Sequence, residues 1–554
     1  MTARVFTLFW LLLCLSAIAE DFPVVVRVNA AETRGPLTPI WRFFGYDEAN
    51  YTYMKDGKKL LAELGQLGGP QVFIRCHHLL TSGDGAYALK WGSTSAYKED
   101  AKGNAIYDWT INDRIFEVYL EHGLKPYVEI GFMPEALSTH AEIYPHHPRV
   151  DERASPDAGQ AYPPKDYQKW GELVFQWTKH CVEKYGQSEV QQWYWEVWNE
   201  PNISYWKGTL EEYFKLYDYA VEGVHRALPA AKVGGPETAG GPGGKFLGEF
   251  LAHCERGTNY VTGEPGVPLD FISFHAKGAP RFVDGHVRMG MANQLRDMRD
   301  AFAIIAASHK YQKLPVVIGE SDPEGCAACT GPQLGYRNGA MYSSYTAASL
   351  AREYELADQY GVSLEGALTW AFEFENQPYF AGFRALATNG LDLPVLNVFR
   401  MFAKMSGQRV AVDSSAALDA GAILARGVRD KADVSAIASL DRDKLCVLLW
   451  HYHDDDVPGP SALVELTMTR LPFASARITH YRIDEQHSNS FTAWKVMGAP
   501  QLPTPPQYKD LEEAGQLARL GSVESLRITN AAATVRFSLP RQAVSLLVLE
   551  NFQP

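Results

Sequence analysis

Short apolar and aromatic runs alternate with helical patterns between about residue 40 and residue 405. Eight of these runs have the length and the β-branched or aromatic composition of strands. They begin near residues 42, 71, 126, 193, 232, 270, 315 and 366. The intervals carry apolar residues at helical spacing, as in YQKWGELVFQWTKHCVEKYG at 167–186. Eight strands, each followed by a helix, predict an α/β fold in which residues 35–405 form a (β/α)8 TIM barrel.

An open, doubly wound sheet is the alternative arrangement for the same alternation of strands and helices. Such a sheet normally carries a glycine-rich phosphate-binding loop directly after its first strand. The sequence GYDEANYTYMKDGKK, which follows the first predicted strand at 45–59, is not a loop of that kind. The sequence therefore favours the closed barrel.

A different pattern begins after residue 405. Alternating or wholly apolar strands such as KLCVLLWHYH at 444–453 and AVSLLVLE at 543–550 are separated by clusters of Pro, Gly and Asp. This pattern predicts an accessory β-sandwich over residues 406–554. The segment PVVVRVNA near the start of the chain also resembles a strand, so residues 20–34 are candidates for an additional edge strand of that sandwich.

Residues 1–19 have the order of a secretory signal peptide: one cation, an apolar run and the small-residue site Ala17-Ile18-Ala19. The apolar run is short for a membrane span. Leu13 stands before Cys14, where a lipoprotein signal would need a small residue. We therefore expect cleavage before Glu20 and an exported protein, periplasmic or secreted, without a membrane anchor.

The composition narrows the range of partners. A formal net charge of -13 argues against nucleic acid or an anionic membrane surface, whereas an aromatic content of 12% suits a neutral ligand with faces to stack on. Cys326 and Cys329 form a CxxC motif, but no second CxxC accompanies it, as structural zinc would require. We expect either a local disulfide or two free thiols there.

Two carboxylates end predicted barrel strands. Glu200 closes the fourth strand, in WYWEVWNEPN at 193–202, and Glu320 closes the seventh, in VVIGESDPEG at 316–325. The carboxyl ends of barrel strands meet at one mouth, where catalytic groups sit. Glycoside hydrolysis needs such a pair, since one carboxyl group protonates the leaving oxygen while an ionised one attacks the anomeric carbon. A single strand-end Glu is more often only solvated or salt-bridged, but here two separate strands present one.

The motifs WNEP and GESDP resemble the acid/base and nucleophile motifs of retaining glycosidases, and the chain is similar to glycoside hydrolase family 39, which includes β-xylosidases and α-L-iduronidases. RCHHLL at 75, FHAKG at 274 and YFAGFRALATNG at 379 support the resemblance. It implies a barrel with an attached sandwich and a retaining reaction without a cofactor or metal. It also implies that Glu200 is the general acid/base and Glu320 the nucleophile.

The same resemblance implies a set of substrate-binding residues. Asn199 corresponds to the residue that binds the sugar 2-hydroxyl. The other matching positions are His77, His275, Lys277 and Arg384, with Glu373 and Glu375 competing for one acidic position.

Two further features are open to more than one interpretation. Arg75 shares a strand face with His77. It either keeps Glu320 ionised or balances Glu196, which lies on the Glu200 face of the fourth strand. The sequence HYHDDD at 451–456 suggests a metal site, but clusters of this kind usually mark turns, so we expect a solvated strand end.

The substrate is the least determined property. Lys277 and Arg384 could clamp a uronate carboxylate, yet an acidic neighbour would neutralise part of that pocket and the net charge gives no steering toward polyanions. We expect release of terminal β-1,4-linked xylose from xylo-oligosaccharides. The alternatives are an α-L-iduronidase-like enzyme, another pentosidase or glycosidase, and a catalytically silent carbohydrate-binding barrel.

Overall fold

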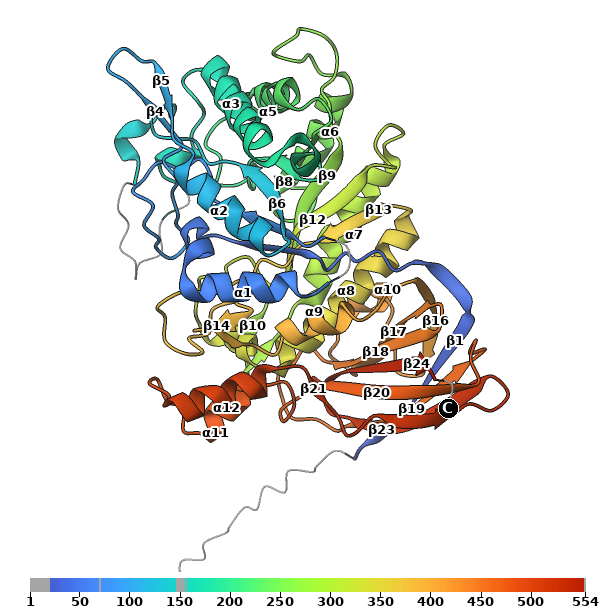
Figure 1. Ribbon diagram of the computed structural model, residues 1–554. Coiled ribbons are helices and arrows are strands. Elements are labelled where there is room, and N and C mark those ends of the chain that lie inside the picture. Colours follow the sequence, from blue (N-terminus) through green and yellow to red (C-terminus); the bar gives the residue numbers. More distant parts are fainter. Residues whose placement is uncertain (1–19, 69–70, 146–154, 156, 553–554) are drawn as a thin grey trace, which may run out of the picture.

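The computed structural model describes residues 20–68, 71–145, 155 and 157–552 (Figure 1). Within this part of the chain, eight parallel strands form a barrel, in which neighbours in sequence order are neighbours in space. A bridge between Phe44 and Thr369 brings the first and last strands together. The barrel strands are β2 (Phe43–Tyr46), β3 (Phe73–Cys76), β6 (Lys125–Ile130), β7 (Tyr194–Val197), β8 (Lys232–Thr238), β9 (Phe271–Lys277), β12 (Pro315–Asp322) and β13 (Ser363–Ala367).

Helices surround the barrel, as the apolar spacing of the sequence predicts. Thr209 starts one of them with a capping box, in which its side chain accepts from the Glu212 N–H while the Glu212 carboxylate accepts from the Thr209 N–H. The last long helix is buried on nearly all sides because it also packs against strands of the sandwich. These helices are α1 (Lys55–Gly65), α2 (Thr110–Glu121), α3 (Tyr167–Tyr185), α5 (Leu210–Ala227), α6 (Phe246–Arg256), α7 (Met291–Ala307) and α8 (Ala340–Tyr360).

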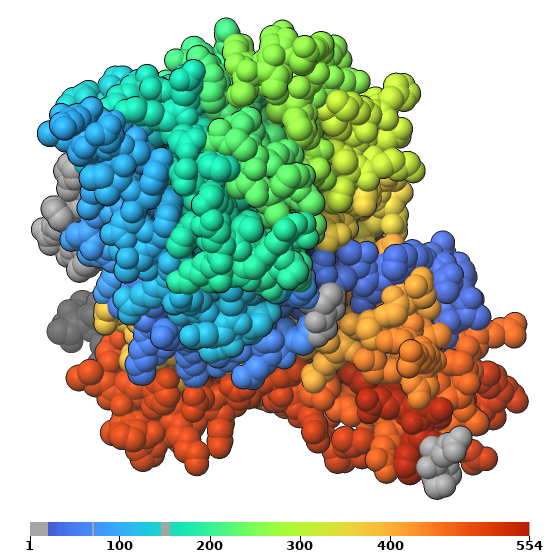
Figure 2. All heavy atoms as spheres, turned by 45° about the horizontal axis from the view of Figure 1, so that its top comes forward, coloured from blue at the N-terminus to red at the C-terminus, as the bar shows by residue number. Residues whose placement is uncertain are grey.

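The remaining large sheet forms the accessory sandwich, so the predicted α/β fold with a TIM barrel and a β-sandwich is confirmed. A helical insertion, α11 (Ser490–Val496) and α12 (Pro505–Gly515), interrupts its strands. Figure 2 shows the barrel seated on the orange and red sandwich, with blue atoms of the N-terminal part lying against orange atoms of the sandwich. The main strands are β1 (Phe22–Pro36), β16 (Gln408–Ser414), β17 (Asp433–Asp441), β18 (Lys444–Tyr452), β19 (Ala462–Thr469), β20 (Ser475–Ile483), β23 (Ala532–Leu539) and β24 (Val544–Asn551).

The strand β1 belongs to this sheet but does not lie at its edge, where the sequence analysis placed it. It pairs antiparallel with β16 and parallel with β19. Val24, Val26 and Val28 are buried on one face of the strand, which is the alternation expected of a strand with one face in a core. That alternation reports which face is buried and carries no information about the number of neighbouring strands.

The HYHDDD segment is also not the solvated strand end that the sequence suggested. His451, His453 and Asp454 are buried, and the segment joins the sandwich to the barrel. Asp455 accepts from Arg288 Nε at 2.5 Å and lies 3.1 Å from His286 Nε2 on β11 (His286–Arg288). Among the described residues, no group of three metal-binding side chains could hold a metal ion. The charges of this segment therefore serve the contact between the two domains.

The sequence analysis also expects a cleaved N-terminal leader and no membrane anchor. Residues 1–19, where a signal peptide is expected, lie outside the described residues. No helix in the described ranges combines the length and the apolar character needed to cross a bilayer.

The domain contact yields a stability prediction. Replacing Asp455 with Asn should lower the free energy of unfolding by about 1–2 kcal/mol, because Arg288 loses a partly buried charged acceptor and His286 a neighbouring carboxylate. Thermal and denaturant unfolding measure the loss. Glu465→Gln is the matched control, since the Glu465–Arg536 pair is exposed and should contribute little. Equal effects of the two substitutions would contradict the assigned role of Asp455.

Candidate active site

Backbone geometry directs the two strand-end carboxylates toward each other. Glu200 follows β7 with φ +44° and Trp198 has φ +75°, a left-handed conformation that is uncommon outside glycine. The Glu200 N–H donates to the Glu237 carbonyl on β8 at 3.0 Å, which fixes this turn. On β12, Gly319 precedes Glu320, and a Cβ at Gly319 would lie 1.4 Å from the Glu237 carboxylate. Glycine is therefore required beside Glu320.

His275, on β9, lies between the two carboxylates. Its Nδ1 lies 2.9 Å from Glu200 Oε1 and 3.8 Å from Glu320 Oε1, and its Nε2 lies 3.5 Å from Glu237 Oε1. The sum of the first two distances is an upper limit on the separation of the Glu200 and Glu320 oxygens. Burial lowers the pKa of His275, but Glu320 and Glu237 raise it to about 10, so the imidazole is charged at neutral pH.

Glu320 is held in its ionised form by its neighbours. Burial acts to raise its pKa, but the neighbouring charges of His275 and Lys277 outweigh burial and lower the pKa well below its usual range. Lys277 Nζ lies 2.5 Å from Glu320 Oε2. The Glu200 side chain is 15% exposed against 7% for Glu320, so Glu200 stands nearer the opening.

Arg75 lies in the layer beneath this pair and is fully buried. It contacts Glu196 at 2.6 Å and Glu129 at 2.9 Å, while its distance to Glu320 is 3.7 Å. The structure therefore places Arg75 against both of the carboxylates that the sequence left open. The shorter distance is to Glu196, and the contribution to Glu320 is a longer-range one.

Asn199 and His77 complete the floor of the site. Asn199 Oδ1 accepts from Arg75 at 3.1 Å, and its buried Nδ2 has no partner among the described residues, so the amide can donate to a ligand. His77 Nδ1 lies 2.5 Å from Glu129 Oε2, and its Nε2 lies 3.9 Å from Glu320 Oε1. Burial lowers the pKa of His77 to about 3, so this imidazole is neutral, unlike His275.

Arg384 lies one layer behind Lys277. Lys277 Nζ also lies 2.6 Å from Asp322 Oδ2, and the same oxygen lies 3.4 Å from Arg384 Nη2. Arg384 is fully buried and pairs with Glu324 at 2.7 Å. It therefore reaches the site through Asp322 and Lys277 and does not line the opening.

Glu373 and Glu375 bind the backbone of other loops. Glu373 accepts from the Gly390 N–H at 2.8 Å, and Glu375 accepts from the N–H groups of Asp56 and Gly57, both at 2.9 Å. Both residues follow the end of β13, where the chain has left the barrel wall and strand alternation no longer directs side chains inward. Neither carboxylate has a recorded contact with Glu200 or Glu320 within the described residues.

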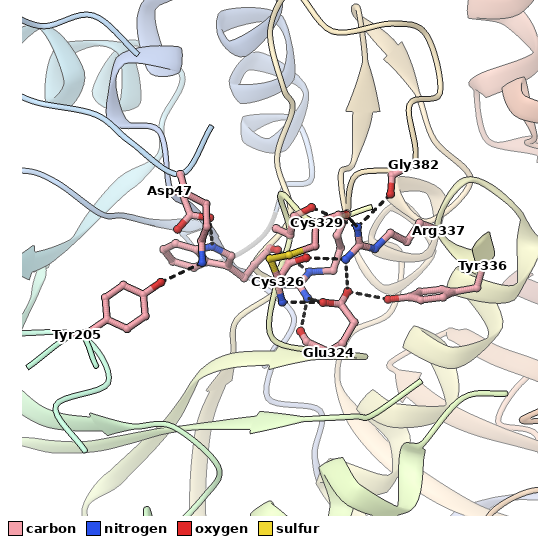
Figure 3. The surroundings of a disulfide bond; sticks show 12 residues. Asp47, Tyr205, Glu324, Cys326, Cys329, Tyr336, Arg337 and Gly382 are labelled. Atoms are coloured by element: carbon pink, nitrogen blue, oxygen red, sulfur yellow. Dashed lines mark hydrogen bonds and ion pairs between the residues drawn. A yellow bond between two sulfur atoms is a disulfide. The ribbon is translucent and has the colours of Figure 1, made fainter. Parts of the chain in front are cut away.

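Several residues that the sequence analysis did not select also reach this mouth. Asp47 lies 3.6 Å from His77 and accepts from Trp370 Nε1 at 3.3 Å, while Lys90 donates to Tyr205 at 2.9 Å. Figure 3 shows Asp47 and Tyr205 near each other. Asp47, Glu129 and Glu237 lie in or directly after predicted strands, so the strand-end criterion could have found them. Lys90 and Tyr205 lie in loops and carry no comparable signal.

Comparison with known proteins gives a consistent result. The model of glycosyl hydrolases family 39 matches residues 24–521. The β-xylosidase of Caldicellulosiruptor saccharolyticus is 27% identical, over 89% of this chain and 92% of its own. The α-L-iduronidase of Mus musculus is 26% identical, over 89% of this chain and 76% of its own. A monomeric β-xylosidase from Caulobacter crescentus CB15 has the same fold, with a TM-score of 0.73, 21% identity, and coverage of 96% and 100% of the two chains.

Proposed function

This chain belongs to the glycosyl hydrolases of family 39, and on that premise we propose that it is a retaining exo-glycosidase that releases terminal β-1,4-linked xylose from xylo-oligosaccharides. The observation that carries the proposal is that Glu200 and Glu320 approach the same ring nitrogen of His275. The two distances limit the separation of these oxygens to at most about 6.7 Å, which accommodates the spacing of about 5–5.5 Å in retaining enzymes and excludes nearly all of the range of about 6.5–9.5 Å in inverting ones.

The reaction proceeds in two steps. In the first, the ionised Glu320 attacks the anomeric carbon while Glu200 gives its proton to the leaving oxygen, which forms a covalent glycosyl-enzyme. The carboxylate left at Glu200 is stabilised by the charged His275 ring 2.9 Å away. In the second step, Glu200 takes a proton from water, and the resulting hydroxyl group displaces Glu320 from the sugar. The unpaired amide of Asn199 is available for a sugar hydroxyl.

The choice of xyloside over uronide concerns one carbon of the sugar. A β-D-xyloside and an α-L-iduronide have the same configuration at C1 to C4, so the two glutamates could serve either. The iduronide carries a carboxylate at C5, where the xyloside has only hydrogens. The 27% identity to a β-xylosidase over most of both chains favours the xyloside. An α-L-iduronide is the second candidate because of the Mus musculus relative.

Substitution of the two glutamates tests the mechanism. Glu320→Gly should abolish turnover of every aryl β-D-xyloside, because no nucleophile remains. Glu200→Ala should cost about 10²–10⁴-fold in kcat/KM for substrates with poor leaving groups and far less for activated ones, which need little protonation. Glu465→Gln, far from the mouth in the sandwich, is the activity control. A product of inverted anomeric configuration by NMR, or no hydrolysis of any aryl xyloside, would contradict the proposal.

Lys277 should set the acid limit of activity. Because its charge lowers the pKa of Glu320, Lys277→Met should raise that pKa. Glu320 must be ionised to attack, so on the acid side kcat/KM should begin to fall at a higher pH than in the wild type. Lys277→Arg keeps the charge and should leave this limit near its original position. The pH profile of kcat/KM measures both variants, and an unmoved limit in Lys277→Met would rule out this role.

We also propose that the protein is exported and begins at Glu20 after cleavage. The leader sequence supports this, as does the Cys326–Cys329 disulfide, which suits an oxidising compartment. Mass spectrometry of the protein made in its own cells should give a terminus at Glu20. A terminus at Met1 would be incompatible with the proposal.

A further inference from the structure

A row of alternating charges runs from the active site into the protein behind it. Each acidic group in the row lies between two basic ones or at an end, and the closest approaches are 2.5, 2.6, 3.4, 2.7 and 2.8 Å along the row. The row consists, in order, of Glu320, Lys277, Asp322, Arg384, Glu324 and Arg337. It contains as many basic as acidic groups.

Glu324 is the most firmly held acidic group of the row (Figure 3). Its Oε2 lies 2.7 Å from Arg384 Nη1 and accepts from the Cys326 N–H at 2.8 Å. Its Oε1 lies 2.8 Å from Arg337 Nη2 and accepts from the Tyr336 hydroxyl at 2.8 Å. Burial acts to raise the pKa of Glu324, but Arg384 and Arg337 lower it to about 2, so the carboxylate stays ionised.

The disulfide loop keeps Glu324 in this position. Cys326, two residues beyond Glu324, forms a disulfide with Cys329. Arg337 donates to the carbonyl of Cys326 at 2.7 Å and to that of Cys329 at 2.6 Å. The loop and its arginine therefore form a fixed frame around the carboxylate, and Glu324 cannot turn away from Arg384.

In this arrangement Lys277 and Arg384, the cations that could bind a carboxylate on the substrate, are each paired with carboxylates of the protein. Arg384 lies between Asp322 and Glu324 and donates its Nε–H to the Trp370 carbonyl at 2.9 Å. Lys277 lies between Glu320 and Asp322. Among the other basic groups of the mouth, His275 faces Glu200, Glu237 and Glu320, whereas Lys90 donates to the Tyr205 hydroxyl at 2.9 Å and is influenced by the charges of Asp47 and Glu200 at longer range.

A uronide would place one more carboxylate among these groups. Removing a carboxylate from water is unfavourable unless an uncompensated cation receives it. A neutral pentoside carries no such charge and needs only hydrogen bonds. A site in which Lys277 and His275 are already paired with carboxylates therefore favours the neutral sugar.

We infer that Glu324 is a specificity-determining residue: by holding Arg384 it leaves Asp322 to pair with Lys277, so that Lys277, the cation that reaches the sugar site, is already compensated and the site selects neutral pentosides against uronides. It acts through Arg384 and does not itself touch the substrate. The inference rests on the proposed function only in taking this barrel mouth as the sugar site, and it deepens that proposal by naming the residue that excludes uronides.

Direct binding of two sugars to the full chain tests the inference. D-xylose and D-glucuronate have the same configuration at C2 to C4 and differ at C5 by the carboxylate, and calorimetry gives both dissociation constants without requiring turnover. Wild type should bind xylose more tightly than glucuronate. In Glu324→Gln, the ratio of the two constants should shift by about tenfold or more toward glucuronate, as one released charge-assisted hydrogen bond allows. Turnover of an aryl α-L-iduronide relative to an aryl β-D-xyloside should shift in the same direction.

Two further variants separate specificity from stability. Glu324→Asp keeps the charge and should keep the wild-type ratio. Glu355→Gln removes a carboxylate beside Arg352, away from the row, and should also leave the ratio unchanged. An unchanged ratio in folded Glu324→Gln would overturn the inference.

The wild-type protein gives an independent test if Glu324→Gln does not fold. Glucuronate binding as tight as that of xylose would show that a cation is available and would overturn the inference as well. Failure of wild type to hydrolyse any aryl xyloside would instead contradict the proposed function, since the binding constants are measured separately.

Discussion

The interior of the barrel depends on the ion pairs that the guanidinium of Arg75 forms with buried carboxylates. Isolated carboxylates in a protein interior are strongly unfavourable, and β6, β7 and β8 bring Glu129, Glu196 and Glu237 to the same buried layer. Arg75 lies within 3.5 Å of all three. Without that central cation, the layer directly beneath the reacting pair could not hold this many carboxyl groups. The barrel accepts them because one planar, permanently charged group has donors enough for several partners.

The upper layer uses the same principle to make two glutamates unequal. Glu320 lies against Lys277 and His275, which hold its charge, whereas Glu200 lies nearer the opening, with its carboxylate 2.9 Å from His275. A nucleophile and a proton donor need opposite protonation states at the same pH. The structure holds the nucleophile ionised by placing Lys277, His275 and Arg75 within 4 Å of Glu320, whereas Glu200 lies nearer the opening.

Sequence patterns predicted the parts of the fold that depend on local periodicity. The eight strands were predictable because their apolar runs face a core on both sides, and Glu200 and Glu320 could be brought together because parallel strands end at one mouth. Partners distant in sequence were not predictable. The alternation in β1 did not reveal that it lies between β16 and β19, and the charges of HYHDDD did not reveal Arg288. Glu373 and Glu375 were ambiguous because they follow a strand end, where alternation stops.

The position of β1 between β16 and β19 affects the order in which the chain can fold. Its residues lie at the start of the chain, yet its parallel partner β19 begins at Ala462, after the whole barrel has been read. Contacts this far apart in sequence form slowly, because a long loop must close before they contribute stability. β1 therefore cannot complete its pairing until β19 has been synthesised. Until β1 pairs with them, β16 and β19 each expose an unpaired edge. Residues from 406 onward, expressed by themselves, would lack an internal strand, so the sandwich is a domain in space but not a separable segment of the sequence.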